Sequence, residues 1–426
     1  EQMLRVSWLM AEMETNKGWP INSIRLIVIV ETAQAIINLA LMTGNLGRPG
    51  TGANSITGQC NAKGSRMFSN TTNLLGGRDF ENPQHREIVA RILGIDAALI
   101  PHQPSWAYDQ IIEGILAGKI RGLWVVATNP AHSWINQHML HDVLSRLEFL
   151  VVQDLFMSET AKFAHLVLPG ASFLEKDGTF TNLERRIQRI RKAVEPPNGI
   201  LPDWQVVCEV SNRMGYPMRY GHPAEIMDEI ATLTPMFAGV SYDRLDHPSG
   251  LQWPVPSPSH KGTALMHQET FPKGKARFVA VDYLPPGEAA SAEYPFILTT
   301  GRVLQHYNCG AQTRRTGILD LVDTDVLEMH PADMARLRLE DGAIVRLVSA
   351  RGQALLPAVS SERVLPGHVF TSFHFPASTV NELLSSSADE SSKCPEYKVS
   401  AVRVEPVQRE ELDSEDEAEL RHMRRQ

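Results

Sequence analysis

The chain has 426 residues, 43% of them hydrophobic, and a formal net charge of −8. This length allows roughly two or three domains with a sizeable core. The acidic balance argues against a general nucleic-acid-binding protein, because a duplex binds to a basic surface. The four cysteines follow no zinc or iron–sulfur spacing and are too few for a disulfide framework. The longest apolar run, residues 24–30, is too short to span a bilayer.

The amino-terminal part combines helical segments with a long polar region. Residues 3–13 are predicted as a helix, and residues 24–30 as a strand or the start of a longer helix. Thr32–Met42 has apolar residues at helical spacing and ends at a glycine-rich stretch. Residues 51–80 are predicted as a long loop, of a length that is usually functional or disordered. Its amide and hydroxyl side chains suit a ligand rich in heteroatoms: Gln59, Asn61, Ser69, Asn70 and Asn73.

Between residues 107 and 170, predicted helices alternate with short apolar strands. Such strands between helices are typical of a parallel sheet covered on both faces, and ligands bind beyond the carboxyl ends of such strands. No GxGxxG motif is present, so an ordinary NAD-binding site is a weak interpretation. The predicted strands are 123–127, 149–152 and 166–168, the helices are 108–116, 135–147 and 160–164, and the strand ends are Thr128-Asn129-Pro130, Gln153-Asp154 and Pro169-Gly170.

The remainder is predicted to be mostly β-structure. A helix at 204–214 is followed by a connecting lobe, 217–290, which is rich in proline and glycine. Several short strands with turn signals then suggest a small barrel. The predicted strands are 296–300, 343–349, 353–359, 368–373 and 398–404, with a short helix at 331–337; the last residues form an acidic and then basic tail.

The stretch from Pro295 to Arg315 has the pattern of a binding segment. Its strand ends at Gly301, and a glycine turn at a strand end presents backbone N–H groups and side chains at one rim of a sheet. An ordinary strand with a solvated loop is the alternative. The polar and aromatic residues after the turn are Arg302, Gln305, His306, Tyr307 and Asn308, and Thr313-Arg314-Arg315 could meet phosphate or another anion.

Six segments, in the same order along the chain, carry a family likeness. They resemble the carboxyl-terminal part of molybdenum or tungsten oxidoreductases that bind bis-molybdopterin guanine dinucleotide, a superfamily that includes formate dehydrogenase catalytic (alpha) subunits and nitrate reductases. The segments are LALMTGNLGRPG (39–50), TGQCNAKG (57–64), residues 151–188, DWQVVCEV (203–210), LTTGRVLQHYNCGAQTRRT (298–316) and CPEYKVSAVRVEP (394–406).

The resemblance implies an α/β fold in which a Rossmann-like parallel-sheet domain precedes a six-stranded β-barrel. The implied boundaries are a cofactor-binding α/β region with long loops at 1–285, a dinucleotide-binding barrel at 286–408 and a charged tail at 409–426. The implied cofactor is bis-molybdopterin guanine dinucleotide with molybdenum or tungsten. We expect a cytoplasmic protein, with the periplasm as the alternative, and no membrane span or nucleic-acid partner.

The resemblance also implies the residues that would hold the cofactor. Carboxylates can accept from guanine N1–H and its exocyclic amine, while amides can meet pyrophosphate and pterin edges. Asn129, Gln153, Asp154, Ser172 and Asp203 match the guanine-dinucleotide positions; Thr300, Gly301, Arg302, His306 and Asn308 match the pterin positions; Asn381, Tyr397 and Lys398 fall in the matching tail segment.

Several of the polar residues also have a structural interpretation. Asp203 could equally be the N-cap of the helix that follows it. His165 is expected to be structural, and Arg185 and Arg186 to form a solvated or ion-paired face. Cys208, in a predicted helix, is expected in the core.

The chain departs from the family pattern in one respect. The family carries a cysteine cluster for a [4Fe–4S] centre and a cysteine or selenocysteine that binds the metal, and Cys60, Cys309 and Cys394 do not match that position. We therefore predict no metal ligand here and expect the iron–sulfur centre in an upstream half or a partner. The alternatives are a fragment, a split subunit completed by another chain, or a paralogue that has lost its chemistry.

The substrate signal is mixed. Formate dehydrogenases carry an arginine where this chain has Thr57, and the TGQ-x-N-A-x-G-x-R pattern with Gln59 and Arg66 resembles nitrate reductases. The two carboxyl-terminal segments resemble formate dehydrogenases. The leading interpretation is a formate dehydrogenase-like enzyme with Thr57, Gln59 and Arg66 at its catalytic site and Arg66 or His306 neutralising an anion. Nitrate reductase and a non-catalytic or truncated cofactor-binding subunit are the alternatives. Expected partners are a small anionic substrate and iron–sulfur or electron-transfer subunits.

Overall fold

A computed structural model describes residues 29–54, 59–68, 73–197, 199–272, 274–390 and 392–407. The helix expected at residues 3–13 and the tail at 409–426 lie outside these ranges. Ile29 and Val30 begin helix α2 (Ile29–Met42), so for these two residues the longer-helix interpretation is confirmed. The described chain forms two compact units, residues 40–107 with 169–276, and residues 29–39 with 108–168 and 277–407.

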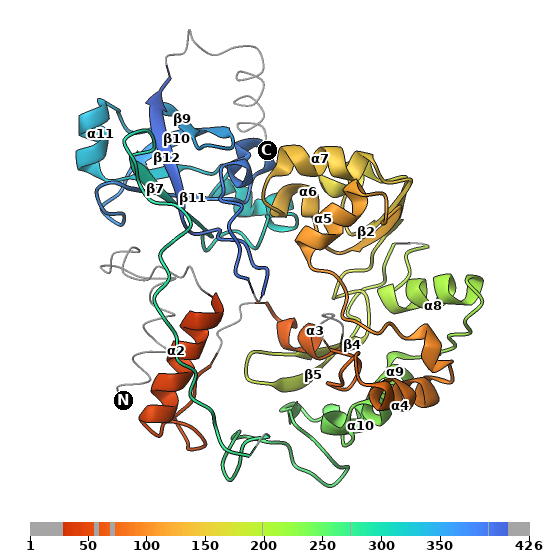
Figure 1. The fold of residues 1–426 in the computed structure, drawn as a ribbon. Coiled ribbons are helices and arrows are strands. Elements are labelled where there is room, and N and C mark those ends of the chain that lie inside the picture. The colour runs from red at the N-terminus through yellow and green to blue at the C-terminus, as the bar shows by residue number, and fades with distance from the viewer. Residues whose placement is uncertain are drawn as a thin grey trace. The chain divides into compact units, whose positions relative to one another are not determined.

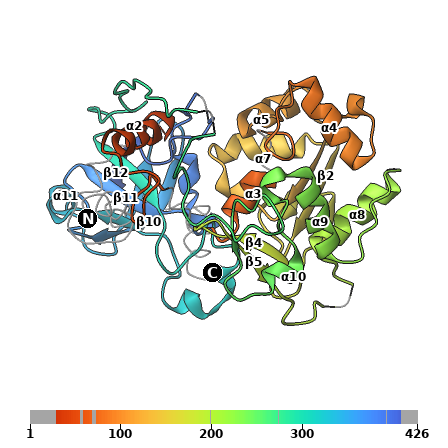
Figure 2. The same ribbon diagram turned by 90° about the horizontal axis from the view of Figure 1, so that it is seen from below.

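The first unit is built around a small antiparallel sheet of order β4-β5-β6. Helices α9 and α10 lie beside this sheet (Figure 2), and Ile187, Phe237 and Val255 are fully buried between them. The elements of this unit are α3 (Ala62–Phe68), α4 (Pro83–Leu93), η2 (Ala97–Leu99), β4 (Gly178–Thr181), β5 (Arg186–Ile190), α8 (Asp203–Arg213), α9 (Pro223–Leu233), η4 (Pro235–Phe237), α10 (Tyr242–Leu245) and β6 (Leu251–Gln252).

Two expectations for this unit are wrong. The stretch 51–80 is not all loop, because it contains α3, which is held by edge-to-face packing of Phe68 on Phe237. The stretch 217–290 is not merely a connecting lobe, because it contains α9. Pro223 occupies the first turn of that helix, where proline is tolerated and preset for helical geometry. A proline-rich composition therefore concealed a regular helix.

The second unit begins with a parallel α/β block. Strands β1 and β2 pair in parallel, which confirms the parallel sheet, and Figure 1 shows α5, α6 and α7 around β2. Leu140, Leu150 and Val152 are completely or almost completely buried between helix and sheet. The elements are α5 (Tyr108–Leu116), β1 (Gly122–Val126), α6 (Pro130–Ser133), α7 (Gln137–Ser145), β2 (Phe149–Asp154), η3 (Thr160–Phe163) and β3 (Leu166–Pro169).

The rest of the second unit contains a closed six-stranded barrel of order β10-β8-β11-β7-β12-β9, which confirms the expected architecture. Side chains alternate between the core and the outside along the strands: in β9, Val345 and Leu347 are buried and Arg346 is not. The elements are β7 (Phe296–Gly301), η5 (Thr313–Arg315), η6 (Gly317–Asp320), β8 (Leu327–Met329), α11 (Pro331–Leu337), β9 (Ile344–Val348), β10 (Gln353–Ser360), β11 (His368–Ser372), η7 (Pro376–Ser378), η8 (Val380–Glu382) and β12 (Ser400–Pro406).

Across the described ranges, every helix is too short or too polar to cross a bilayer. The implied boundaries at residues 285 and 408 stay a prediction.

The barrel core should dominate the stability of the second unit. Leu298 in β7 is 0% exposed, so Leu298→Ala should lower the free energy of unfolding by about 2–5 kcal/mol through lost burial and a cavity. Leu321, which is 73% exposed, provides the matched control, and Leu321→Ala should cost no more than about 0.5 kcal/mol. Urea denaturation followed by circular dichroism measures both, and equal losses would contradict the assigned core.

Candidate functional site

Two segments leave the barrel at the same rim. Strands β7 and β11 are parallel neighbours, and Gly301 at the end of β7 is the register partner of Ser372 at the end of β11. Residues 302–308 and 373–378 therefore emerge side by side. A side chain at position 301 would come within 2.5 Å of the Phe370 ring, so a larger residue there would have to displace that ring.

The structure brings three of the predicted cofactor-binding residues together at the end of β7. The Thr300 hydroxyl donates to the carbonyl oxygen of Tyr397 at 2.6 Å, and Lys398 Nζ donates to the carbonyl oxygen of Thr300 at 2.7 Å. These contacts fix residues 397–398 against the rim from which the 302–308 segment departs.

His306 and Arg302 differ in what they can offer a ligand. The His306 ring is buried, and its Nε2 donates to the carbonyl oxygen of Val322 at 2.8 Å while Nδ1 lies 2.9 Å from Thr313 Oγ1. Both ring nitrogens are thus engaged by the protein, and a cofactor contact by His306 stays a prediction. Arg302 is exposed and forms no ion pair with any described residue, so its charge is available to an anion.

Asp325 is a buried carboxylate beneath this rim that the sequence did not reveal. It accepts hydrogen bonds from the backbone N–H groups of His374 and Phe375, each at 3.1 Å. The hydroxyls of Ser372 and Ser378 also donate to it, the latter at 2.6 Å. Four donors satisfy this fully buried carboxylate, as a buried charge requires.

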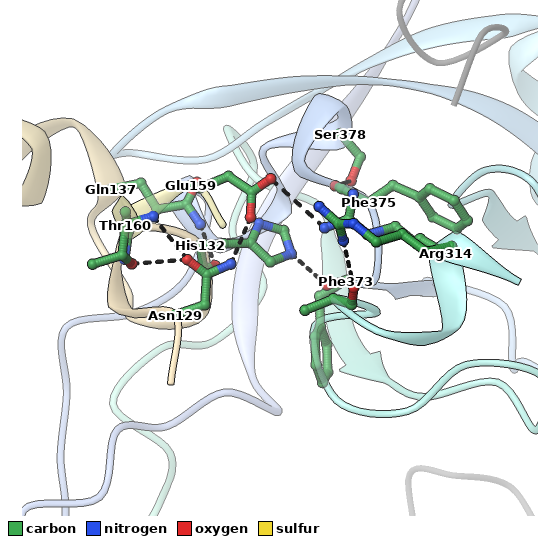
Figure 3. Close-up of polar contacts among 12 residues, drawn as sticks. Asn129, His132, Gln137, Glu159, Thr160, Arg314, Phe373, Phe375 and Ser378 are labelled. Carbon is green, nitrogen blue, oxygen red and sulfur yellow. Dashed lines mark hydrogen bonds and ion pairs between the residues drawn. The ribbon is translucent and has the colours of Figure 1, made fainter. Parts of the chain in front are cut away.

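A second polar cluster joins the α/β block to the barrel within the second unit (Figure 3). The Asn129 amide donates to Glu159 at 2.5 Å, and its oxygen accepts from the Thr160 N–H and hydroxyl at 3.0 and 2.8 Å. The other Glu159 oxygen lies 3.6 Å from the guanidinium of Arg314 of the barrel, whose side chain is 8% exposed. The amide of Asn129 is therefore engaged by protein groups.

The electrostatics of this cluster favour an ionised Glu159. Burial alone would raise the pKa of Glu159, but the hydrogen bond from Asn129 and the charge of Arg314 hold that pKa below its usual value. Burial lowers the pKa of His132, whose Nε2 donates to the carbonyl oxygen of Phe373 at 3.1 Å. Charge neutralisation across this contact therefore comes from Glu159 and Arg314, with His132 as a neutral donor.

The Thr313-Arg314-Arg315 stretch was expected to meet an anion. The structure turns Arg314 toward the carboxylate of Glu159, which is an anion of the protein itself, and places the Arg315 guanidinium 4.6 Å from the centre of the Phe156 ring. Both arginines thus attach the barrel to the segment that follows β2.

The carboxyl ends of the parallel strands lie at this same contact. Ala127, just after β1, has a left-handed backbone (φ 51°), and its N–H donates to the carbonyl oxygen of Gln153 at 2.8 Å. Asp154 accepts from the N–H of Leu155 at 2.7 Å. From the barrel side, the Asn381 amide donates to the carbonyl oxygen of His132 at 2.9 Å.

Two buried oxygen atoms here lack a hydrogen-bond partner among the described residues. They are Oγ of Ser158, which follows β2, and Oδ1 of Asn381. Buried polar atoms without partners are rare and call for an explanation such as a ligand. A guanine dinucleotide carries ring N–H groups, an exocyclic amine and phosphates, so this set of side chains fits such a group chemically.

The other predicted site residues belong to the first unit. Asp203 is ion-paired with Lys176, and the N-cap of α8 is Pro202, so the N-cap interpretation of Asp203 is wrong. The N–H of Ser172 donates to Glu175 at 2.7 Å. Gln59 precedes α3 and Arg66 lies in its last turn, while Thr57 lies outside the described residues.

The remaining polar residues have structural contacts, although Arg185 is half-buried against backbone carbonyl oxygens and not part of a solvated or ion-paired face. His165 Nδ1 accepts the N–H of Leu150 at 3.0 Å. Arg185 donates to the carbonyl oxygens of Thr263 and Ala264, each at 3.0 Å, and Arg186 also pairs with Glu184 at 3.8 Å. Cys208 is buried in α8.

Comparison with known proteins gives two family matches. Residues 29–213 match the family model described as molybdopterin oxidoreductase, and residues 296–401 match the one described as "Molydopterin dinucleotide binding domain". Acetylene hydratase from Pelobacter acetylenicus has a similar structure, with a TM-score of 0.56 and 17% identity, over 81% of this chain and 52% of that one. At this identity the likeness supports the fold alone.

Three curated relatives show the range of similar proteins. The chain is 38% identical over 391 residues to F420-dependent formate dehydrogenase 2 subunit alpha of Methanococcus maripaludis, covering 89% of this chain and 56% of that protein. It is 36% identical over 388 residues to the assimilatory nitrate reductase catalytic subunit of Bacillus subtilis (88% and 54%) and 32% over 385 residues to formate dehydrogenase H of Escherichia coli (89% and 54%). The chain thus spans about half the length of these relatives.

Replacing the Asp325 carboxylate should destabilise the rim. Asp325→Asn places an amide N–H against groups that all donate to this position, so the free energy of unfolding should fall by about 2–3 kcal/mol. Asp320, exposed in η6, is the matched control, and Asp320→Asn should change stability by less than about 0.5 kcal/mol. Urea denaturation tests both variants. Wild-type stability in Asp325→Asn would contradict the hydrogen-bond network described above.

Proposed function

The chain belongs to the molybdopterin oxidoreductase family, and we propose that it forms the bis-molybdopterin guanine dinucleotide-binding part of a formate dehydrogenase-like enzyme. In the complete enzyme formate would be oxidised to carbon dioxide and a proton, with two electrons passed to an acceptor. The observation that carries the proposal is the gathering of Thr300, Arg302 and Lys398 at one rim of the closed barrel. The similarity to formate dehydrogenase alpha subunits supports the choice of substrate.

The residues of this chain would bind and orient the cofactor. Arg302 supplies a positive charge at the rim for an anionic group, and Lys398 stays fixed by the carbonyl oxygen of Thr300. Gln153, Asp154 and Asn381 would meet the dinucleotide at the strand ends. When bound, the cofactor supplies the metal centre for the two-electron transfer.

The catalytic residues and partners belong to the same proposal. The proposed catalytic residues are Thr57, Gln59 and Arg66, and the charge of Arg66 would neutralise the anionic substrate. Ser172 and Asp203 are further residues proposed to bind the dinucleotide. The iron–sulfur centre would lie in the remaining half of the enzyme or in an electron-transfer subunit, and the compartment would be the cytoplasm. A domain boundary at 285 would separate the α/β region from the barrel, and one at 408 would separate the barrel from the charged tail.

Nitrate reduction is the second candidate. One observation in its favour is Thr57, because formate dehydrogenases carry an arginine at this position. The other is the similarity to the Bacillus subtilis assimilatory nitrate reductase catalytic subunit. Both candidates use a small anionic substrate and the same cofactor, so the cofactor-binding proposal does not depend on the choice between them.

The complete enzyme distinguishes these proposals. The chain is produced with its coding-sequence neighbours, the purified protein is assayed for molybdenum, tungsten and pterin, and dye reduction by formate is compared with reduced-dye oxidation by nitrate. We expect pterin, metal and formate-dependent dye reduction. Nitrate turnover alone would favour the second candidate, cofactor without either activity would indicate a non-catalytic subunit, and absence of pterin would contradict cofactor binding.

Arg302 should contribute to cofactor retention. Losing one charge-assisted contact in Arg302→Gln should weaken binding about tenfold or more. Arg363, in the same barrel with a side chain 74% exposed, is the control, and Arg363→Gln should retain wild-type pterin content. Fluorescence of the oxidised pterin released from equal amounts of folded protein gives the comparison. Equal pterin content in both variants would remove Arg302 from the binding site.

A further inference from the structure

The segment from Arg302 to Asn308 has an irregular backbone that needs an external support. These residues belong to no helix or strand, and the side chains of Arg302, Leu304 and Tyr307 are exposed. Asn308, at its end, has a left-handed backbone with φ 50°. Such conformations persist where the surrounding structure imposes them.

His374 provides that support by bridging the two ends of the segment. Its Nε2 accepts the N–H of Val303 at 3.1 Å, and its Nδ1 donates to the carbonyl oxygen of Asn308 at 2.6 Å. One imidazole therefore sets the distance between the start of the segment and its strained end. The two contacts also fix the ring as the neutral tautomer with hydrogen on Nδ1.

The ring is itself held in place from below and from the side. His374 is fully buried, and its backbone N–H donates to the Asp325 carboxylate at 3.1 Å. The His306 ring lies 5.4 Å away, centre to centre. At Gly310 a side chain would come within 2.8 Å of the His374 carbonyl oxygen, so glycine allows the returning chain to pass close by. The imidazole has little room to turn.

We propose that neutral His374 is a positioning residue that holds residues 302–308 in the conformation presented to the pterin, and that acid releases this segment and with it the cofactor. The inference rests on the proposed function for the identity of the ligand. The support of the segment by the imidazole does not depend on that identity, because it follows from the two hydrogen bonds to Val303 and Asn308.

Protonation of the ring would break one of its two contacts. A second ring hydrogen, on Nε2, would face the N–H of Val303, and two donors cannot bond to each other. Burial lowers the pKa of His374 from the ordinary value of 6.5; of the neighbouring groups, Asp325 opposes this shift, and His306 and Arg302 reinforce it. His374 therefore binds a proton less readily when residues 302–308 are held than when they are released. Stability is therefore fully present above pH 6.5 and is lost as pH falls below it toward the lowered pKa.

Two substitutions of His374 separate positioning from bulk packing. His374→Phe keeps a ring but removes both polar atoms, whereas His374→Gln keeps one donor and one acceptor and cannot titrate. His368 is the first residue of β11, at the end of that strand away from His374, which follows it, so His368→Phe is the matched control. All variants are made in the complete enzyme, and pterin content is measured after incubation between pH 5 and pH 8.

We expect His374→Phe to hold about tenfold less pterin than wild type at pH 7.5, and His368→Phe to match wild type. His374→Gln should retain the cofactor at pH 7.5 and should lose the part of the acid release that wild type shows below pH 6.5. Wild-type pterin content in folded His374→Phe would overturn the proposal. Acid release in His374→Gln identical to that of wild type would overturn its pH-dependent part.

Hydrogen exchange distinguishes failure of this inference from failure of the proposed function. In the cofactor-free chain the Val303 amide should exchange slowly in wild type and at least about tenfold faster in His374→Phe, because its acceptor is gone. If wild type binds no pterin but this difference appears, the proposed function fails and the support by His374 stands. Equal exchange rates of the Val303 amide in the two proteins overturn the inference. If His374→Phe does not fold, wild type is compared with His374→Gln at pH 5.5. At that pH His374→Gln should protect the Val303 amide from exchange better than wild type does.

Discussion

Strands β7 and β11 run in the same direction as neighbours in the closed barrel, and this pairing decides what can meet at its rim. Because their register ends with Gly301 opposite Ser372, the two following segments start about one strand spacing apart. An antiparallel pairing would have sent them to opposite ends. The contacts of His374 with Val303 and Asn308, and the anchoring of His374 by Asp325, are consequences of that direction.

The contact between the α/β block and the barrel depends on geometry more than on net attraction. The carboxylate of Glu159 and the guanidinium of Arg314 are both largely buried, and taking two charges out of water offsets most of what their attraction provides. What the pair supplies is a fixed position, since a displaced Arg314 would leave Glu159 buried without its counter-charge. Asn129, whose amide is engaged by Glu159 and Thr160, contributes to the same alignment.

Much of the architecture could be predicted from local patterns. Short apolar runs such as 149–152 between helical stretches predicted the parallel sheet, and the glycine turn after residue 300 located the rim. Strand β8 was missed because three residues are too few to show alternation. Asp325 and His374 were missed for a different reason: their importance arises from the order of strands around the barrel, which brings together segments about fifty residues apart. The sequence around Arg314 is also typical of an arginine that binds a ligand anion. Only the structure shows that Arg314 is buried and pairs with Glu159 of the protein itself.

Closure of the barrel has a consequence for the protein before it receives its cofactor. Each of the six strands has neighbours on both sides, so the barrel has no edge strand, whose row of unpaired peptide groups a second chain could pair with. The three-stranded sheet of the α/β block does end in such rows, at β1 and β3, as far as the described strands go. The antiparallel sheet of the first unit ends in such rows too, at β4 and β6, so association of molecules through their sheets would begin at one of these open sheets rather than at the barrel.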